Sequence, residues 1–314
     1  MIEILYLAAA VPFIIGLKRL GGPKTARSGN RLAAAGMLAA LVIALVDEGI
    51  LNWPTVVAGL IVGSVLGVWA AIRVKMTAMP QMVAAFNGFG GVASALVAAA
   101  AVVETGLDGI PVETSVTILV STVIGAITFT GSFVAFAKLQ GIIWGRPLLF
   151  PGQQIINSLL IVSAVGVGIW SVVAGDASGY WIVGGISLLI GVLAVVPIGG
   201  ADMPVVISLL NSFSGLAASS AGFVIENNAL IIGGALVGAA GFILTVQMTQ
   251  AMNRTLGNVL FTGFGGTDIV AGSGAISDKP VKRATAEDAA IALGYAESVM
   301  IVPGYGLAVA QAQH

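Results

Sequence analysis

The chain has 314 residues, of which 58% are hydrophobic and only 9% are charged. A soluble domain usually carries about 25% charged residues, so the composition excludes an ordinary soluble protein and indicates that a lipid bilayer is the main solvent. A net charge of −1 provides no basic surface for nucleic acid, and the lack of cysteine excludes thiolate catalysis and thiolate metal sites. We therefore expect neither nucleic acid nor a metal ion to bind.

Nine apolar stretches have about the length needed to cross a bilayer, which takes roughly 20 residues. The first follows Glu3 and lacks a basic n-region, so we interpret it as a retained span and not as a signal peptide. The second is short. The pattern predicts an all-α polytopic membrane protein in which residues 1–252 form a bundle of nine transmembrane helices. The stretches are 3–17, 31–46, 53–73, 80–103, 113–138, 155–174, 180–198, 203–225 and 228–252.

The basic residues alternate between the gaps. All thirteen Lys and Arg residues fall in every second gap between the apolar stretches or in the C-terminal segment, and the remaining gaps contain only acidic charges. Short loops rich in Lys and Arg stay on the cytoplasmic side of a membrane. The charge pattern therefore predicts that the N-terminus lies outside the cell and that residues 253–314 lie inside it.

The apolar stretches stop at Asn253. Glycine and serine are frequent over residues 263–274, which is typical of a flexible connector. We assign residues 253–284 to a linker.

A soluble segment is expected after this linker. Thr285–Asp288 is typical of a helix start with acidic residues in the first turn, and the helix should run to about Leu293. Residues 298–302 have the β-branched, apolar character of a buried strand. The chain ends at His314, too soon to complete a nucleotide-binding domain of ordinary size. We interpret residues 285–314 as the truncated start of a Rossmann-like α/β domain.

Gly304, Gly306 and Val309 approximate the dinucleotide fingerprint directly after the predicted strand. In that fingerprint the glycines permit a tight turn and let backbone N–H groups approach a pyrophosphate at a helix N-terminus. The acidic residue that reads the ribose is expected about 20 residues further on, beyond His314. An ordinary glycine-containing turn between a strand and a helix explains the pattern equally well.

Uncharged polar residues are the candidates for chemistry inside the bundle, because no apolar stretch has an ionisable residue near its middle. Asn87, Ser132 and Asn211 lie at similar depths from the cytoplasmic ends of their stretches, within about one turn at about 1.5 Å per residue. Each belongs to a stripe of small or polar residues at helical spacing. The stripes are Asn87, Gly91 and Ser94; Ser121, Gly125, Thr128 and Ser132; and Ser208, Asn211, Gly215 and Ser219.

Two interpretations of these stripes remain open. They could line one hydrated path in the cytoplasmic half of the bilayer, or they could serve close helix packing, which small residues at this spacing usually do. For Ser121, Thr128 and Ser219 packing is the favoured interpretation. The two asparagines fit either interpretation, because their amides are costlier to bury. The run Gly234, Gly238 and Gly241 we assign to packing.

Two charged residues flank the last spans. Asp202 stands at a predicted helix start, where N-capping would explain it; a carboxylate there could also respond to the adjacent soluble segment. Arg254 follows the last span directly and is by default a positive-inside anchor.

Five segments of the chain resemble the β subunit of proton-translocating nicotinamide nucleotide transhydrogenase. They occur in the same order and with similar spacing, the resemblance covers essentially the whole length, and together the segments are far more specific than any one of them. They are Met-Thr-Ala-Met-Pro at 76–80, Thr-Phe-Thr-Gly-Ser at 128–132, Gly-Gly-Ala-Asp-Met-Pro-Val-Val at 199–206, Asn-Ser-Phe-Ser-Gly at 211–215 and Pro-Gly-Tyr-Gly-Leu-Ala-Val-Ala-Gln-Ala-Gln at 303–313.

The resemblance implies an enzyme in which hydride passes from NADH to NADP⁺ between two soluble domains while a proton enters the cell through the membrane domain. NADP(H) would bind to the complete form of the domain that begins at 285, and NAD(H) to a partner α subunit. The family implies a Re/Si-specific enzyme, a dimer of αβ units in the inner (plasma) membrane, that is active only with the α subunit and the complete NADP(H) domain.

The family's functional positions match several of these residues. The resemblance places Ser132 and Asn211 in the proton path and implicates Asp202 and Arg254 in coupling. It assigns the motif at 304–309 to NADP(H). It provides no catalytic residue here, because the cofactors carry the hydride chemistry.

One position departs from the family. Well-known members have a membrane histidine in a segment that resembles residues 84–88, whereas this chain has Asn87. Some members carry that histidine on an α-subunit helix, so we expect the partner chain to supply it.

Two other functions are alternatives to the transhydrogenase. A secondary transporter for a small neutral solute often has internal repeats, but the nine stretches show no convincing division into two halves. A structural membrane scaffold would explain the small-residue stripes and leave the motif at 304–309 unexplained.

Overall fold

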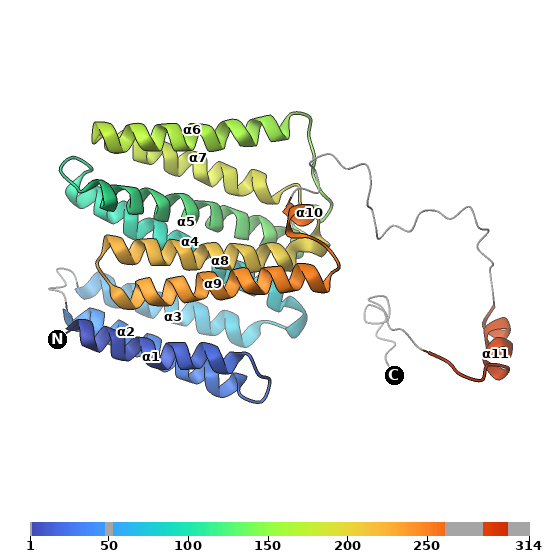
Figure 1. Cartoon of the computed structure of the whole chain (residues 1–314). Coiled ribbons are helices and arrows are strands. Elements are labelled where there is room, and N and C mark those ends of the chain that lie inside the picture. Colours follow the sequence, from blue (N-terminus) through green and yellow to red (C-terminus); the bar gives the residue numbers. More distant parts are fainter. Residues whose placement is uncertain (1, 48–52, 261–284, 301–314) are drawn as a thin grey trace. The chain divides into compact units, whose positions relative to one another are not determined.

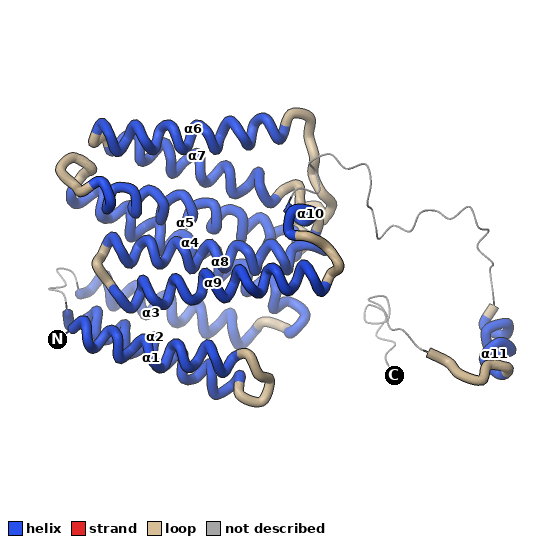
Figure 2. Tube along the Cα trace, in the orientation of Figure 1, coloured by secondary structure: helices blue, strands red, loops and turns tan. Residues whose placement is uncertain are grey.

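The structure is a computed structural model, and it describes residues 2–47, 53–260 and 285–300. Within these residues every regular element is a helix (Figure 2). The α-helices are α1 (Ile2–Leu20), α2 (Ala26–Asp47), α3 (Trp53–Arg73), α4 (Met79–Thr105), α5 (Val112–Leu139), α6 (Gln153–Ala174), α7 (Ala177–Val195), α8 (Met203–Val224), α9 (Asn228–Ala251), α10 (Leu256–Leu260) and α11 (Ala286–Gly294). The 3₁₀-helices are η1 (Met76–Ala78) and η2 (Gly200–Asp202).

Eight helices of the described residues, α2 to α9, are long and apolar enough to cross a membrane. Nine spans were predicted. The difference is α1, which covers the first predicted stretch but carries Glu3 near one end and Lys18 and Arg19 near the other. Its uninterrupted apolar run is therefore shorter than the roughly 20 residues that a span needs.

The chain divides into two compact units, residues 1–265 and 266–314. In the first unit α5 is central and packs against α4, α7 and α8, while α8 packs against α9, and α1 against α2 and α9. Figure 1 shows the long helices side by side, with α6 and α7 at one side and α1 and α2 at the other. The loops predicted to be cytoplasmic, α1–α2, α3–α4, α5–α6 and α7–α8, all lie at the same end of this unit.

Capping residues explain where several helices begin. Pro80 and Pro204 stand in the first turns of α4 and α8, where a missing N–H costs nothing. Asp176 begins α7 by accepting a hydrogen bond from the Ser178 N–H at 2.8 Å, and this bond lowers the pKa of the Asp176 carboxyl below its usual value. Asn227 caps α9 through the Leu230 N–H at 3.0 Å.

The glycine run on α9 packs as expected. A Cβ atom added at Gly241 would lie 2.9 Å from the Ser212 nitrogen of α8, and Gly234 and Gly238 face the same helix closely. Small residues let the two backbones approach, which is the usual basis of helix association in membranes.

The second unit has one described helix, α11. Thr285 and Asp288 form a reciprocal capping box at its start, which confirms the predicted position. The predicted strand is not formed at residues 298–300, because a strand needs a hydrogen-bonded neighbour and the described ranges contain no strand. The rest of that strand and the fingerprint residues Gly304, Gly306 and Val309 lie outside the described residues. In the first unit, α10 falls within the predicted linker, and its Val259 is buried in the core.

Candidate functional site

Three side chains from three helices meet inside the bundle. Asn87 of α4 is 7% exposed, and its Nδ2 donates a hydrogen bond to Ser132 Oγ of α5 at 2.9 Å. The Ser214 hydroxyl of α8 donates to Asn87 Oδ1 at 2.7 Å. We call Asn87, Ser132 and Ser214 the amide–hydroxyl cluster. It ties together segments that are 45 and 127 residues apart in the sequence.

Glycines allow α4 and α5 to approach closely at the cluster. A Cβ atom added at Gly91 would lie 2.8 Å from Gly125 O and from Thr128 Cβ, and one at Gly125 would lie 3.1 Å from Ala95 Cβ. Only residues without a side chain fit between these backbones. The two predicted stripes on α4 and α5 therefore do face each other.

The predicted stripe on α8 faces mainly α9. Ser208 donates to Gly241 O at 3.3 Å and Ser219 donates to Ile231 O at 3.1 Å, while Gly215 packs against the glycines of α9. Ser121 of α5 is similarly held between two backbone carbonyls, those of Ser94 and Ala217. These residues fit the packing interpretation.

The contribution of α8 to the cluster is Ser214, which the sequence pattern did not single out. Asn211, the residue predicted there, is half-buried and takes no part in the hydrogen bonds of the cluster. It lies three residues before Ser214, so the two are neighbours on the helix surface. Ser214 belongs to the Asn-Ser-Phe-Ser-Gly segment at 211–215, and its helical spacing from Asn211 is the signal that could have identified it.

Asp202 and Arg254 form an ion pair. Arg254 Nη1 lies 2.9 Å from Asp202 Oδ1 and 2.8 Å from Oδ2, and the side chains are 36% and 9% exposed respectively. Asp202 occupies the N-cap position of α8, but its carboxylate makes no capping hydrogen bond. The N-cap explanation is therefore wrong for the side chain, because Arg254 engages both carboxylate oxygens. Arg254 is likewise more than a loop anchor.

Lys138 is buried near this ion pair in the fold. Its Nζ donates to Ile198 O at 2.7 Å, Val196 O at 2.5 Å and Arg146 O at 3.4 Å. Sequence reasoning treated Lys138 only as a marker of the cytoplasmic side. In the structure it binds the carbonyls that follow α7, directly before η2 and Asp202, and thereby fixes the segment that presents the carboxylate.

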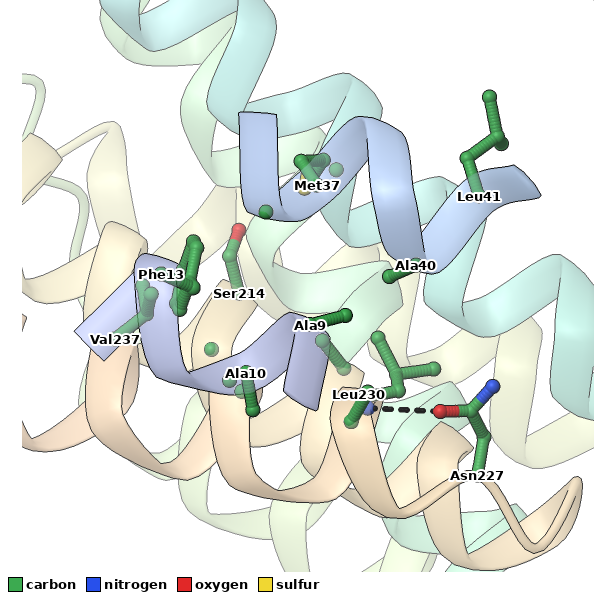
Figure 3. A pocket seen from close by; sticks show the side chains of 17 residues that line it. Ala9, Ala10, Phe13, Met37, Ala40, Leu41, Ser214, Asn227, Leu230 and Val237 are labelled. Carbon is green, nitrogen blue, oxygen red and sulfur yellow. Dashed lines mark hydrogen bonds between the residues drawn. The ribbon is translucent and has the colours of Figure 1, made fainter. Parts of the chain in front are cut away.

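A cavity of about 460 Å³ reaches the cluster from α1, α2 and α9. Figure 3 shows Ser214 among side chains that are otherwise mostly apolar, including Phe13, Met37 and Leu230. A group placed in this cavity would meet Ser214, and through it Asn87. The cavity is therefore an approach to the amide–hydroxyl cluster.

Fold and site together define a polytopic helical membrane protein with an uncharged polar cluster in its core and an ion pair at the start of α8, the helix that also carries Ser214. In this class, function resides in the rare polar groups within the bundle.

The comparisons with known proteins identify the family. The model of the NAD(P) transhydrogenase beta subunit matches residues 2–314. The NAD(P) transhydrogenase subunit beta of Rhodospirillum rubrum is 42% identical over 98% of this chain and 68% of the relative, and the same values hold for the protein of that name from strain ATCC 11170. The chain belongs to the NAD(P) transhydrogenase beta subunit family and is a membrane subunit of the proton-translocating enzyme. The transporter alternative is not supported.

Proposed function

We propose that the amide–hydroxyl cluster is the central part of a proton pathway through the membrane unit, coupled to hydride transfer from NADH to NADP⁺. The observation that supports this most strongly is the joining of Asn87, Ser132 and Ser214 by hydrogen bonds across three helices. Burying an amide is costly, and helix packing does not require one. Asn211, one turn from Ser214, continues the pathway toward the start of α8.

The cluster organises water and does not itself carry the proton charge, because none of its side chains titrates near neutral pH. A titratable group must come from elsewhere. We propose a histidine of the partner α subunit, whose ordinary pKa of about 6.5 suits reversible protonation. The cavity lined by Ser214 is the place where such a group would reach the cluster.

The ion pair of Asp202 and Arg254 is the proposed coupling element. Asp202 begins the helix that carries Ser214, and twelve residues of α-helix correspond to about 18 Å. Making or breaking the ion pair in response to the soluble domain would shift α8 and change the geometry of the cluster. Lys138 keeps the segment before Asp202 in place during this change.

The remaining proposals concern the cofactors, the assembly and the membrane topology. NADP(H) binds to the complete domain that begins at 285, with Gly304, Gly306 and Val309 approaching its pyrophosphate. NAD(H) binds to the α subunit. The assembly is a dimer of αβ units in the inner membrane, the reaction is Re/Si-specific, and α1 forms a ninth span with the N-terminus outside.

Reconstitution tests this function. The complete β subunit is co-expressed with the α subunit and placed in liposomes, and NADH-dependent reduction of an NADP⁺ analogue is followed together with proton movement. An imposed proton gradient in the pumping direction should accelerate hydride transfer, and an ionophore should remove the acceleration. Hydride transfer that is indifferent to the gradient would contradict the proposal. The variants Asn87→Leu and Ser214→Ala, each of which removes one polar group of the amide–hydroxyl cluster, supply the comparison.

A further inference from the structure

Thr128 has a buried hydroxyl without a partner. Its residue is 0% exposed, and Oγ1 makes no hydrogen bond within the part of the chain that the structure describes. Buried polar side chains in proteins are nearly always hydrogen-bonded to protein or to ordered water. The residue lies in the predicted stripe on α5, one turn from Ser132.

Threonines in helices usually satisfy their hydroxyl within the same helix, by donating to the carbonyl one turn earlier. Thr105 and Thr245 do so at 2.7 Å and 2.8 Å. Thr128 makes no such bond. Its hydroxyl is therefore available to a partner outside its own backbone.

Ser132 has an unused donor on the same face of α5. Its Oγ accepts a hydrogen bond from Asn87 Nδ2, but its own hydroxyl proton has no acceptor among the described residues, and the residue is 0% exposed. Thr128 and Ser132 stand at i and i+4, where Cβ atoms are about 5–6 Å apart. No hydrogen bond joins the two hydroxyls, because Thr128 Oγ1 has no partner among the described residues, and this spacing suits one bridging water.

The facing helix offers no side chain in place of that water. Asn87 already bonds to Ser132, and the next residue of the α4 stripe is Gly91. A Cβ atom added at Gly91 would lie 2.8 Å from Thr128 Cβ and 2.9 Å from Cγ2, so α4 approaches Thr128 here without a polar group. The ligand of the two hydroxyls must be small.

We propose that a water molecule binds between Thr128 and Ser132, where its oxygen accepts a hydrogen bond from the Ser132 hydroxyl and it also hydrogen-bonds to Thr128 Oγ1. Two polar partners are the minimum that an ordered internal water requires. This water extends the amide–hydroxyl cluster by four residues of α5, about 6 Å, toward Val112 at the other end of the helix. Its part in proton transfer rests on the proposed function; its binding does not.

Thr128→Val is the decisive variant because the two explanations predict opposite results. Val has the shape of Thr without the hydroxyl. If Thr128 binds water, removing the hydroxyl takes away one of the water's two partners. The water is then weakly held or lost, the Ser132 hydroxyl proton loses its acceptor, and the thermal melting temperature falls. If the hydroxyl has no partner at all, its replacement leaves the melting temperature unchanged or raises it. The second result would overturn the proposal.

Two further variants test the two proposed partners of the water separately. Thr128→Ser retains the hydroxyl and should keep the bound water, which infrared spectra in H₂¹⁸O would report as an isotope-shifted O–H band. Ser132→Ala removes the other partner, so its effect on stability should be non-additive with that of Thr128→Val. Should Thr128→Val not fold, the infrared band in the wild type and its loss in Ser132→Ala decide the matter. The absence of such a band in the wild type would overturn the site.

The last comparison is of the rate of proton-coupled hydride transfer in variants of the complete αβ enzyme. We expect Thr128→Val to slow proton-coupled hydride transfer by about two- to tenfold, the effect of losing one hydrogen bond from the pathway. Thr130→Val is the matched control, since its hydroxyl bonds to Leu188 O at 2.8 Å on the α7 side. A wild-type enzyme without coupling would refute the proposed function, while the melting temperatures would still decide whether Thr128 holds water.

Discussion

Asn87 Nδ2 and Ser132 Oγ are 2.9 Å apart although the residues are separated by 45 positions in the sequence. The amide joins α4 to α5, and its oxygen joins α4 to α8 through Ser214. Asn87 is therefore the one member of the amide–hydroxyl cluster that bonds to both of the others.

Removing the Asn87 amide should lower the rate of proton-coupled hydride transfer more than removing either hydroxyl of the cluster. Asn87→Leu keeps the number and branching of the side-chain heavy atoms and breaks two hydrogen bonds, each contributing about 0.5–1.5 kcal/mol. We expect proton-coupled hydride transfer to fall by about tenfold or more. A double-mutant cycle with Ser132→Ala measures the coupling free energy between Asn87 and Ser132. If the losses of hydride-transfer rate in the two single variants simply add in the double variant, the two residues do not act together.

Asn211 should contribute to the pathway without being part of the cluster. Replacing Asn211 by Leu should lower proton pumping and coupled hydride transfer together while the protein still inserts into the membrane. The polar amide would no longer organise water one turn from Ser214. Pumping at the wild-type rate in inserted Asn211→Leu would mean that the side chain only packs.

The ion pair of Asp202 and Arg254 should be needed for coupling between proton movement and hydride transfer. It should contribute little to the stability of the fold. Arg254 is 36% exposed, so solvent screening limits the pair to about 0.2–1 kcal/mol. Asp202→Asn and Arg254→Gln should each make hydride transfer insensitive to a proton gradient while the protein remains folded. The exchanged pair Asp202→Arg with Arg254→Asp should recover part of the response. Unchanged gradient sensitivity in both single variants would exclude this role.

Cysteine labelling tests the orientation, and the lack of native cysteine makes the test simple. Cysteines placed at Asp108, between α4 and α5, and at Lys24, between α1 and α2, should react with an impermeant reagent from opposite sides of the membrane. Because α2, α3 and α4 lie between the two positions, labelling from the same side would refute the predicted orientation.

The helices of the membrane unit could be predicted closely from the sequence, because long apolar runs record burial in lipid directly. The stretch predicted at 113–138, for example, is the helix Val112–Leu139. The helix start at Thr285 could likewise be predicted, since its capping box depends on residues only three positions apart. The predicted count of nine spans is not confirmed among the described residues, because charges near both ends of α1 shorten its apolar run.

The site was only partly predictable, because its contacts are long-range. The depth of a residue along its helix identified Asn87 and Ser132. Depth does not indicate which face of α8 points toward these two residues. For this reason Asn211 was predicted and Ser214 was missed. Lys138 was interpreted as a marker of the cytoplasmic side, and nothing in the local sequence indicates its hydrogen bonds to carbonyls 58 and 60 residues away. The pairing of Asp202 with Arg254 spans 52 residues and follows from the packing of α8 on α9.

The most direct test of the proposed pathway compares two buried serines in the complete αβ enzyme reconstituted in liposomes. Ser214→Ala removes a hydroxyl from the cluster, whereas Ser187→Ala removes one that bonds only within α7, to Val183 O at 2.7 Å. The measurement is the initial rate of proton uptake during hydride transfer. We predict that Ser214→Ala lowers it by about three- to tenfold and that Ser187→Ala leaves it near the wild-type rate. Equal rates in the two variants would contradict a proton pathway through the amide–hydroxyl cluster.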